Sequence, residues 1–270
     1  MKLFDLSDKV IVVTGATGVL AGTAADYLLT QGAKVVYLGR SQKKLEAVMT
    51  RAGDAKSRVL TFSCDVLDQG SLENVRGEVL QQWGRIDALI NAAGGNMPGA
   101  VIGPDQTFSD LKLDDYSKVL ELNLNGTVIP SVVFGETFSE QKSGNIINFS
   151  SMAADKTITR VLGYSNAKAG IDNFTRWLAV ELAQKFGEGL RVNAIAPGFF
   201  IADQNRRLLT NEDGSYTERG QDVIRKTPFR RFGESEELCG TLHYLLSDAS
   251  KFVTGTVIPV DGGFSCYSGV

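Results

Sequence analysis

The sequence alternates short β-rich runs with longer segments of helical apolar spacing, and this alternation restricts the possible folds most strongly. Strands that alternate with helices of this length form right-handed crossovers and a parallel sheet covered on both faces. We therefore predict an α/β fold, a doubly wound seven-stranded parallel sheet in a three-layer α/β/α sandwich. The strand-like runs are 10–14, 34–38, 58–62, 86–91, 145–149, 190–196 and 257–260. The helical patterns lie near 20–31, 41–52, 69–83, 114–141, 163–186 and 234–247.

No linker or low-complexity stretch interrupts this pattern along the 270 residues. We therefore expect one domain that spans residues 1–270. Ligands of such sheets bind beyond the carboxyl ends of the strands, so the loops that follow strands are the places to search. The longest weakly patterned stretch, about 197–233, is predicted to act as a substrate lid.

Charge and cysteine content exclude several classes of partner. The chain carries 28 Lys and Arg against 31 Asp and Glu, and no basic run stands out, so nucleic acids and anionic membranes are poor partners. Cys64, Cys239 and Cys266 are too few and too scattered for a disulfide framework or a zinc site, which suggests a reducing compartment. The amino-terminal residues lack an apolar signal core, and no apolar run approaches a membrane span. We expect a cytoplasmic protein that binds a small molecule.

The chain contains a single histidine, His243, in a stretch with helical apolar spacing. A surface or interface position on that helix is the expected role. Serine–histidine hydrolysis and multi-histidine metal sites are therefore improbable, and we predict no metal. Acid–base chemistry in this chain must come from carboxylates, lysine or tyrosine.

The first predicted strand leads directly into a turn that contains glycine and opens a helix. Such a turn brings backbone N–H groups to a pyrophosphate at the positive end of the helix, as in Rossmann-type folds. The Gly-x-Gly-x-x-Gly spacing itself is absent, so a tight turn without a ligand remains an alternative. The candidate contacts to a dinucleotide in this turn are Gly15, Thr17, Gly18, Val19 and Leu20.

The second strand ends where the ribose of a dinucleotide would lie. An acidic residue there would bind the ribose 2′-hydroxyl, but this chain has Gly39 followed by Arg40. A guanidinium without a neighbouring carboxylate favours a 2′-phosphate and hence NADP(H). The alternative is that Arg40 is a solvated residue near the start of a helix. The next two strand ends add small or polar residues beside which a cofactor could lie, namely Asp65, Val66, Asn91, Ala92, Ala93 and Gly94.

A group of reactive side chains follows the fifth strand. Ser151 lies at its end, and Tyr164 and Lys168 follow at i, i+4 spacing on a predicted helix. A nearby ammonium stabilises a phenolate and lowers the pKa of tyrosine toward working pH. Tyr164 could then exchange a proton with an alcohol oxygen to which Ser151 is hydrogen-bonded.

Together these motifs resemble those of the short-chain dehydrogenase/reductase family, in order, from Thr14 to Gly263. The resemblance implies a catalytic triad of Ser151, Tyr164 and Lys168, with Asn123 completing a proton relay. It also implies that Asp65 contacts adenine, and that the segment after the sixth strand lies on the nicotinamide side. The cofactor residues on that side are Pro197, Gly198 and Phe200.

The sequence departs from the family pattern in the cofactor region. Val19 and Ala21 occupy the places of the second and third glycines of the family turn, so that turn must be remodelled. Gly18 stands where many NADP enzymes of the family carry a basic residue, so NAD(H) also remains possible. Ala92 replaces the second asparagine of Asn-Asn-Ala-Gly, and Ala202 replaces a frequent threonine.

The segments least typical of the family, 94–98, 159–161 and 198–207, are rich in amide and guanidinium groups. Such a composition favours a hydroxylated anionic substrate over a steroid or an acyl chain. Arg160 is the first candidate for binding a carboxylate and Arg206 the second, with solvent or interface positions as the alternatives. Candidates for reading hydroxyl groups are Asn96, Gln204 and Asn205, and Ser151 would hold the reacting oxygen.

These segments and the chain end resemble a branch of the family that interconverts D-fructuronate and D-mannonate. Related branches reduce other keto-sugar acids such as 5-ketogluconate. A reductase of 3-oxoacyl thioesters is an alternative, but it should show an apolar channel and a basic docking patch. A nucleotide-sensing regulator on the same fold would typically have lost the tyrosine or the lysine, and both are present.

The resemblance also implies a homotetramer in which the helices near 114–141 and 163–186 pair across subunits. The second of these helices carries Phe174, Trp177 and Leu178, a large apolar load for one face. We therefore expect subunit contacts along this helix.

Overall fold

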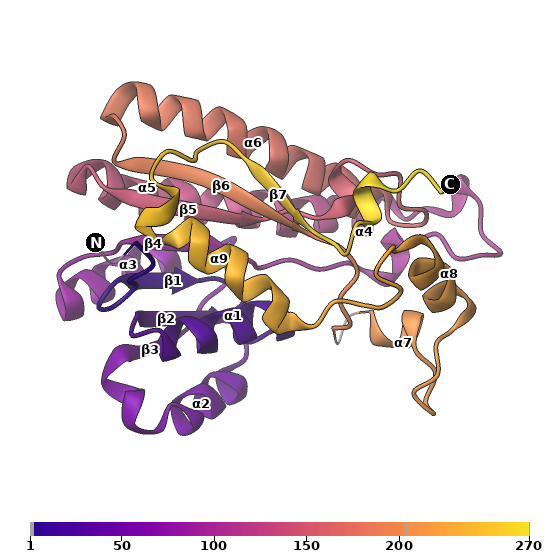
Figure 1. The fold of residues 1–270 in the computed structure, drawn as a ribbon, viewed down its shortest axis with the longest axis horizontal. Helices are drawn as coiled ribbons and strands as arrows, with labels where there is room; N and C mark the ends of the chain where they lie inside the picture. The colour runs from indigo at the N-terminus through magenta and orange to yellow at the C-terminus, as the bar shows by residue number, and fades with distance from the viewer. Residues whose placement is uncertain (1–2, 203–204, 270) are drawn as a thin grey trace.

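The computed structural model describes residues 3–202 and 205–269. Its seven strands form one parallel sheet in the order β3-β2-β1-β4-β5-β6-β7, which is the predicted doubly wound arrangement (Figure 1). Each strand lies within about two residues of its predicted position. The strands are β1 (Val10–Val13), β2 (Lys34–Gly39), β3 (Val59–Ser63), β4 (Ala88–Asn91), β5 (Gly144–Phe149), β6 (Leu190–Pro197) and β7 (Val257–Val260).

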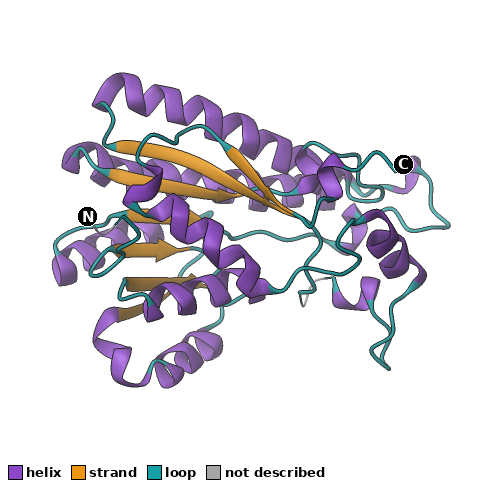
Figure 2. Ribbon diagram, viewed as in Figure 1, coloured by secondary structure: helices purple, strands orange, loops and turns teal. Residues whose placement is uncertain are grey.

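Helices cover both faces of the sheet (Figure 2). Successive residues of a strand point to opposite faces, so each strand contributes side chains to both layers. Ile11 and Val13 of β1 pack with α1, α2 and α9, whereas Val10 and Val12 pack with α3, α5 and α6. The predicted three-layer sandwich is therefore confirmed. The helices on the first face are α1 (Val19–Thr30), α2 (Gln42–Arg51) and α9 (Cys239–Leu246). Those on the second face are α3 (Gln69–Trp83), α5 (Gly126–Gln141) and α6 (Leu162–Phe186).

The segment predicted as one helix over 114–141 is interrupted. It consists of α4 (Leu113–Leu120), a π-helical turn over Glu121–Asn125, and then α5. The turn contains the fully buried Asn123, whose Nδ2 donates to the carbonyl oxygens of Val119 (2.8 Å) and Gly95 (2.7 Å). π-helical turns occur frequently at functional sites.

The weakly patterned region 197–233 contains two short helices, α7 (Arg206–Leu209) and α8 (Glu218–Lys226), which we did not predict. They lie beyond the carboxyl ends of the strands (Figure 1). Leu209, Val223 and Phe232 form a small apolar cluster beneath them, separate from the two clusters on the sheet. This region therefore packs around a small core of its own.

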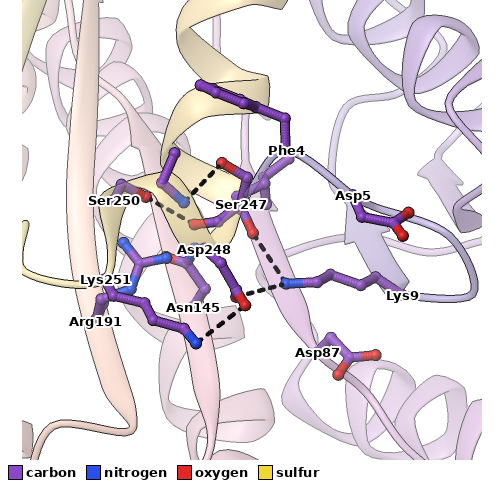
Figure 3. Close-up of polar contacts among 12 residues, drawn as sticks. Phe4, Asp5, Lys9, Asp87, Asn145, Arg191, Ser247, Asp248, Ser250 and Lys251 are labelled. Carbon is purple, nitrogen blue, oxygen red and sulfur yellow. Dashed lines mark hydrogen bonds and ion pairs between the residues drawn. The ribbon is translucent and has the colours of Figure 1, made fainter. Parts of the chain in front are cut away.

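At the opposite end of the sheet, polar contacts join the amino ends of the strands to the residues at the end of α9 (Figure 3). The carbonyl of Leu245, near the end of α9, accepts hydrogen bonds from Asn145 of β5 (2.7 Å) and Arg191 of β6 (2.9 Å). Asp248 pairs with Lys9, just before β1. His243 lies on α9, as expected, and is half-buried there, with its ring nitrogens in contact with the Tyr27 hydroxyl and the Phe4 carbonyl. In the described part of the chain, no helix has the length and apolar composition needed to cross a bilayer.

Candidate active site

A cavity of about 420 Å³ lies at the carboxyl ends of the strands and collects most of the predicted site residues. Six predicted residues, Thr17, Arg40, Asp65, Val66, Asn91 and Arg206, are not among those that line it, and Gln204 lies outside the described residues. The predicted residues that line it are Gly15, Gly18, Val19, Leu20, Ala92, Ala93, Gly94, Asn96, Asn123, Ser151, Arg160, Tyr164, Lys168, Pro197, Gly198, Phe200 and Asn205.

The turn after β1 brings the start of α1 against the end of β4. Gly15 has φ +67°, and a Cβ there would lie 2.9 Å from the main chain of Ala92 and Ala93, so only glycine fits. The Thr14 hydroxyl accepts the N–H groups of Ala92 (3.0 Å) and Ala93 (3.1 Å), which fixes the two turns together. The close approach of these two turns forms one wall of the cavity.

The amino-terminal end of α1 faces this cavity through Val19 and Leu20. It has no side-chain cap and no acidic residue in its first turn, so its positive end is not neutralised. Such a helix terminus can hold a pyrophosphate without the glycines at positions 19 and 21. The residues of the turn therefore fit a dinucleotide.

The end of β2 leaves no space for an acidic side chain. A Cβ on Gly39 would lie 2.6 Å from the Thr17 side chain, which covers this position. Arg40 is exposed beside it, and its guanidinium makes no hydrogen bond or ion pair within the described residues. Asp65, also exposed, accepts a hydrogen bond from the N–H of Leu67 (3.0 Å). Val66 is buried against Gly126.

The Asn91 side chain lies within the protein, away from the cavity. Its Nδ2 donates to the Ser131 hydroxyl (2.8 Å) and to Oδ1 of Asn148 (3.0 Å), and Asn148 donates to Thr175 (2.9 Å). This buried network links β4 and β5 to α5 and α6. The side chain of Asn91 therefore has a structural role, and only its main chain is left for a cofactor.

Tyr164, Lys168, Ser151 and Asn123 converge on the cavity from three elements. Tyr164 and Lys168 lie one turn apart on α6, and Nζ of Lys168 lies 5.3 Å from the centroid of the Tyr164 ring. Ser151 follows β5, and its hydroxyl is hydrogen-bonded to Tyr164. Asn123 reaches the same region through Gly95, whose N–H it accepts at 3.2 Å.

The pKa of Tyr164 differs from the sequence-based expectation. Burial raises this pKa above its usual value, and the hydrogen bond with Ser151 lowers it by less. We expected Lys168 to lower it, but the ammonium contacts the ring and donates to the Phe149 carbonyl (2.6 Å). Lys168 is itself buried, which lowers its own pKa to about 8, although the charge of Asp172 opposes this shift.

The candidate substrate residues differ in whether they line the cavity and in whether their side chains are free to bind a ligand. Arg160 lines the cavity, as does the exposed Asn96, while Arg206 is exposed outside it. Asn205 also lines the cavity, but its amide holds the loop together by accepting from Ala202 (2.8 Å) and donating to the Phe200 carbonyl (2.8 Å).

Sequence reasoning missed one cation of this site, Arg219 of α8, which lines the same cavity. It is one of many charged residues in the weakly patterned region, so nothing in the sequence distinguished it. The segments rich in amide and guanidinium groups do not form the cavity wall alone, because apolar side chains also line it. These are Val161 of the segment 159–161, together with Val101, Met152, Ile158, Leu208 and Leu209.

A doubly wound sheet, an uncapped helix terminus at the cavity and a tyrosine–lysine pair beside a serine define a class of nucleotide-dependent oxidoreductases. In agreement, a family model described as enoyl-(acyl carrier protein) reductase matches residues 15–265. The chain belongs to the short-chain dehydrogenase/reductase family, whose members use NAD(H) or NADP(H).

Several known proteins are similar over nearly the full chain. An uncharacterized oxidoreductase of Bacillus subtilis, UxuB, is 44% identical, with 98% of each chain covered. A crystal structure from Haemophilus influenzae, provisionally named a D-mannonate oxidoreductase and holding bound NAD, is 39% identical with a TM-score of 0.90 and 98% of each chain covered. A 3-oxoacyl-[acyl-carrier-protein] reductase of Synechocystis is 31% identical, over 96% of this chain and 97% of the relative.

Proposed function

We propose that this oxidoreductase interconverts a keto-sugar acid and its alcohol, with D-fructuronate and D-mannonate as the pair. The observation that carries this proposal is the position of Arg160, a cavity residue that precedes the turn of α6 bearing Tyr164. A guanidinium binds a carboxylate in a bidentate manner, and amides such as that of Asn96 read hydroxyl groups. The similarity to the Haemophilus protein, provisionally named for D-mannonate, supports the same substrate.

The chemistry follows from the four converging side chains. The nicotinamide, when bound, supplies the hydride that reaches the carbonyl carbon. Tyr164 donates a proton to the oxygen as its negative charge develops, and Ser151 holds that oxygen by a hydrogen bond. In this proposal, Lys168 keeps positive charge near the phenol, and Asn123, which is hydrogen-bonded to Gly95, completes the proton relay. In this proposal, the region 197–233 closes over the substrate as a lid.

The cofactor preference is also part of the proposal. The uncapped end of α1 accepts the pyrophosphate of either dinucleotide, and Arg40 favours the 2′-phosphate of NADP(H). Gly18 adds no second cation, and the Haemophilus relative binds NAD, so NAD(H) is accepted as well. We propose a preference for NADP(H) that depends on Arg40.

The decisive experiment is a reductase assay on D-fructuronate, D-tagaturonate, 5-ketogluconate and an acetoacetyl thioester, with both cofactors. D-fructuronate should give the highest kcat/KM. Equal activity on neutral ketoses would remove the carboxylate interaction from the proposal.

Reduction of a 3-oxoacyl thioester is the second candidate. The apolar side chains on the cavity wall, among them Val101, Met152 and Leu208, favour it, as does the similarity to the Synechocystis reductase. Dominant activity on the acetoacetyl thioester in the same assay would establish this function and overturn the first.

A further inference from the structure

Arg219 connects the region 197–233 to the segment that precedes the catalytic helix. It lies in the first turn of α8, and its guanidinium donates to the hydroxyl and to the carbonyl of Thr159, both at 3.3 Å. Thr159 directly precedes Arg160, and both arginines line the cavity. Two guanidiniums from separate parts of the chain therefore border the same space.

Within the described residues, this pair of arginines has no ion-pair partner. No carboxylate forms an ion pair with Arg160 or Arg219 in residues 3–202 and 205–269, and the nearby Asp222 is paired with Arg225. The Nε of Arg219 is buried without a hydrogen-bond partner. Burial, and then the charge of Arg160, lower the pKa of Arg219, and the charge of Asp222 opposes this shift by less. Two neighbouring cations that form no ion pair among these residues, with a buried unpaired donor, are unfavourable unless a bound anion completes the site.

The backbone of Arg160 adds an independent observation. Its φ of +78° lies in the left-handed region, which arginine rarely adopts, and its carbonyl is held there by the N–H of Ile102 at 3.0 Å. Such conformations persist where the surrounding structure imposes them, and they concentrate at ligand-binding sites. Here the conformation places a strained arginine at the entrance to α6, beside Arg219.

We propose that Arg219 and Arg160 together bind the carboxylate of the substrate, and that Arg219 thereby couples α8 to substrate binding. This inference rests on the proposed function and names the residue that selects acids over neutral sugars. In D-fructuronate, three hydroxylated carbons separate the carbonyl carbon from the carboxyl carbon, so the carboxylate can bind away from Tyr164. The two Thr159 contacts use one hydrogen of each terminal nitrogen of Arg219, so each of these nitrogens keeps a second N–H to donate to the acid.

The test measures binding without turnover. D-mannonate and its uncharged analogue D-mannitol are titrated into the enzyme loaded with NADPH, which cannot oxidise them, and binding is followed by calorimetry. Arg219→Gln should weaken D-mannonate binding about tenfold or more and leave D-mannitol and NADPH binding unchanged. Arg219→Lys, which retains the charge but not the planar fork, should lie between Arg219→Gln and wild type. The matched control is Arg225→Gln on the same helix, whose side chain is exposed and does not line the cavity.

Wild-type D-mannonate affinity in Arg219→Gln would overturn the inference. The kinetic assay separates this failure from that of the proposed function. If D-fructuronate is reduced and Arg219→Gln leaves its KM unchanged, the inference fails while the function stands. If D-fructuronate is not reduced but carboxylate binding still depends on Arg219, the anion site stands and the assigned substrate is wrong.

Discussion

The ammonium of Lys168 donates a 2.6 Å hydrogen bond to the main-chain carbonyl of Phe149, the last residue of β5. This contact fixes the lysine between the central sheet and the Tyr164 ring. Because Lys168 is only 4% exposed, the cost of desolvation lowers its pKa to about 8. Burying the charged form of the proposed catalytic lysine therefore destabilises the folded protein at neutral pH.

This cost predicts a pH-dependent effect of Lys168→Met on stability. The unfolded chain binds the lysine proton up to about pH 10.5, whereas the folded chain releases it near pH 8. Between these values the unfolded state binds more protons, so Lys168 destabilises the fold fully below pH 8 and progressively less up to pH 10.5. At pH 7, Lys168→Met should raise the free energy of unfolding by about 1–3 kcal/mol, and the gain should shrink by pH 10.

Urea denaturation at pH 7 and pH 10 measures this difference. Lys185→Met is the matched control, because Lys185 lies on the same helix with a largely exposed side chain paired to Glu181. A stability difference for Lys168→Met that does not change with pH would contradict the prediction.

Tyr164→Phe tests the proposed proton transfer. Phenylalanine keeps the ring beside Lys168 but removes the hydroxyl that is hydrogen-bonded to Ser151. Turnover should fall at least ~100-fold, as expected for the loss of a general acid. NADPH fluorescence should show unchanged cofactor binding in the variant. Near wild-type turnover would remove Tyr164 from the mechanism.

The fold was predictable because each strand is mostly apolar, so that its local sequence signal agrees with its packing in the sheet. The prediction of one helix failed for the segment 114–141. Val119 and Thr127 lie on either side of the π-helical turn, yet both fit a single helical pattern in the sequence. The Asn123 amide of this turn donates to the carbonyl of Gly95, a residue distant in the sequence. Periodicity within one segment cannot report such a contact.

The candidate site was predictable where spacing along one element determines it, as for Tyr164 and Lys168 on α6. The rest of the site was not predictable, because contacts between segments far apart in the sequence determine it. The network around Asn91 involves three other elements, and Arg219 reaches Thr159 across 60 residues of sequence. These contacts leave no local pattern in the sequence.

Arg40→Gln tests the proposed cofactor preference. The exposed guanidinium is free to pair with a 2′-phosphate, and it has no counterpart to bind on NADH. We expect kcat/KM to fall about 10-fold or more for NADPH and to change little for NADH. Steady-state kinetics with each cofactor at fixed substrate measures the ratio. A wild-type ratio that favours NADH would show that the preference is wrong.

The proposed homotetramer predicts that the outer face of α5 and α6 is covered by another subunit. Trp177 and Val180 of α6 are 59% and 58% exposed, and Val132 of α5 is 63% exposed. An isolated chain rarely exposes such an apolar face without a partner. Light scattering should give the mass of a tetramer for the wild type and a smaller mass for Trp177→Arg. Phe229→Arg, an exposed change on another part of the chain, is the control. A wild-type monomer at micromolar concentration would refute the assembly.

Replacing Arg160 by glycine should separate stability from substrate binding. The left-handed backbone at this position costs a non-glycine residue about 1–3 kcal/mol, and glycine adopts it freely. Part of that gain is offset, because glycine also gives the unfolded chain more freedom. Arg160→Gly also removes the cation beside Arg219. We therefore expect the free energy of unfolding to rise by about 1 kcal/mol.

The same variant should bind the acid poorly, with KM for D-fructuronate raised ~10–1000-fold, because half of the proposed carboxylate site is gone. Arg160→Ala is the matched variant, since it loses the same side chain but keeps the strained backbone. It should show the same rise in KM with a smaller gain in stability than Arg160→Gly. Chemical denaturation and steady-state kinetics on both proteins measure the two effects. Equal stabilities for the glycine and alanine variants would show that the backbone at residue 160 stores no strain, while a KM unchanged in both would remove Arg160 from the substrate site.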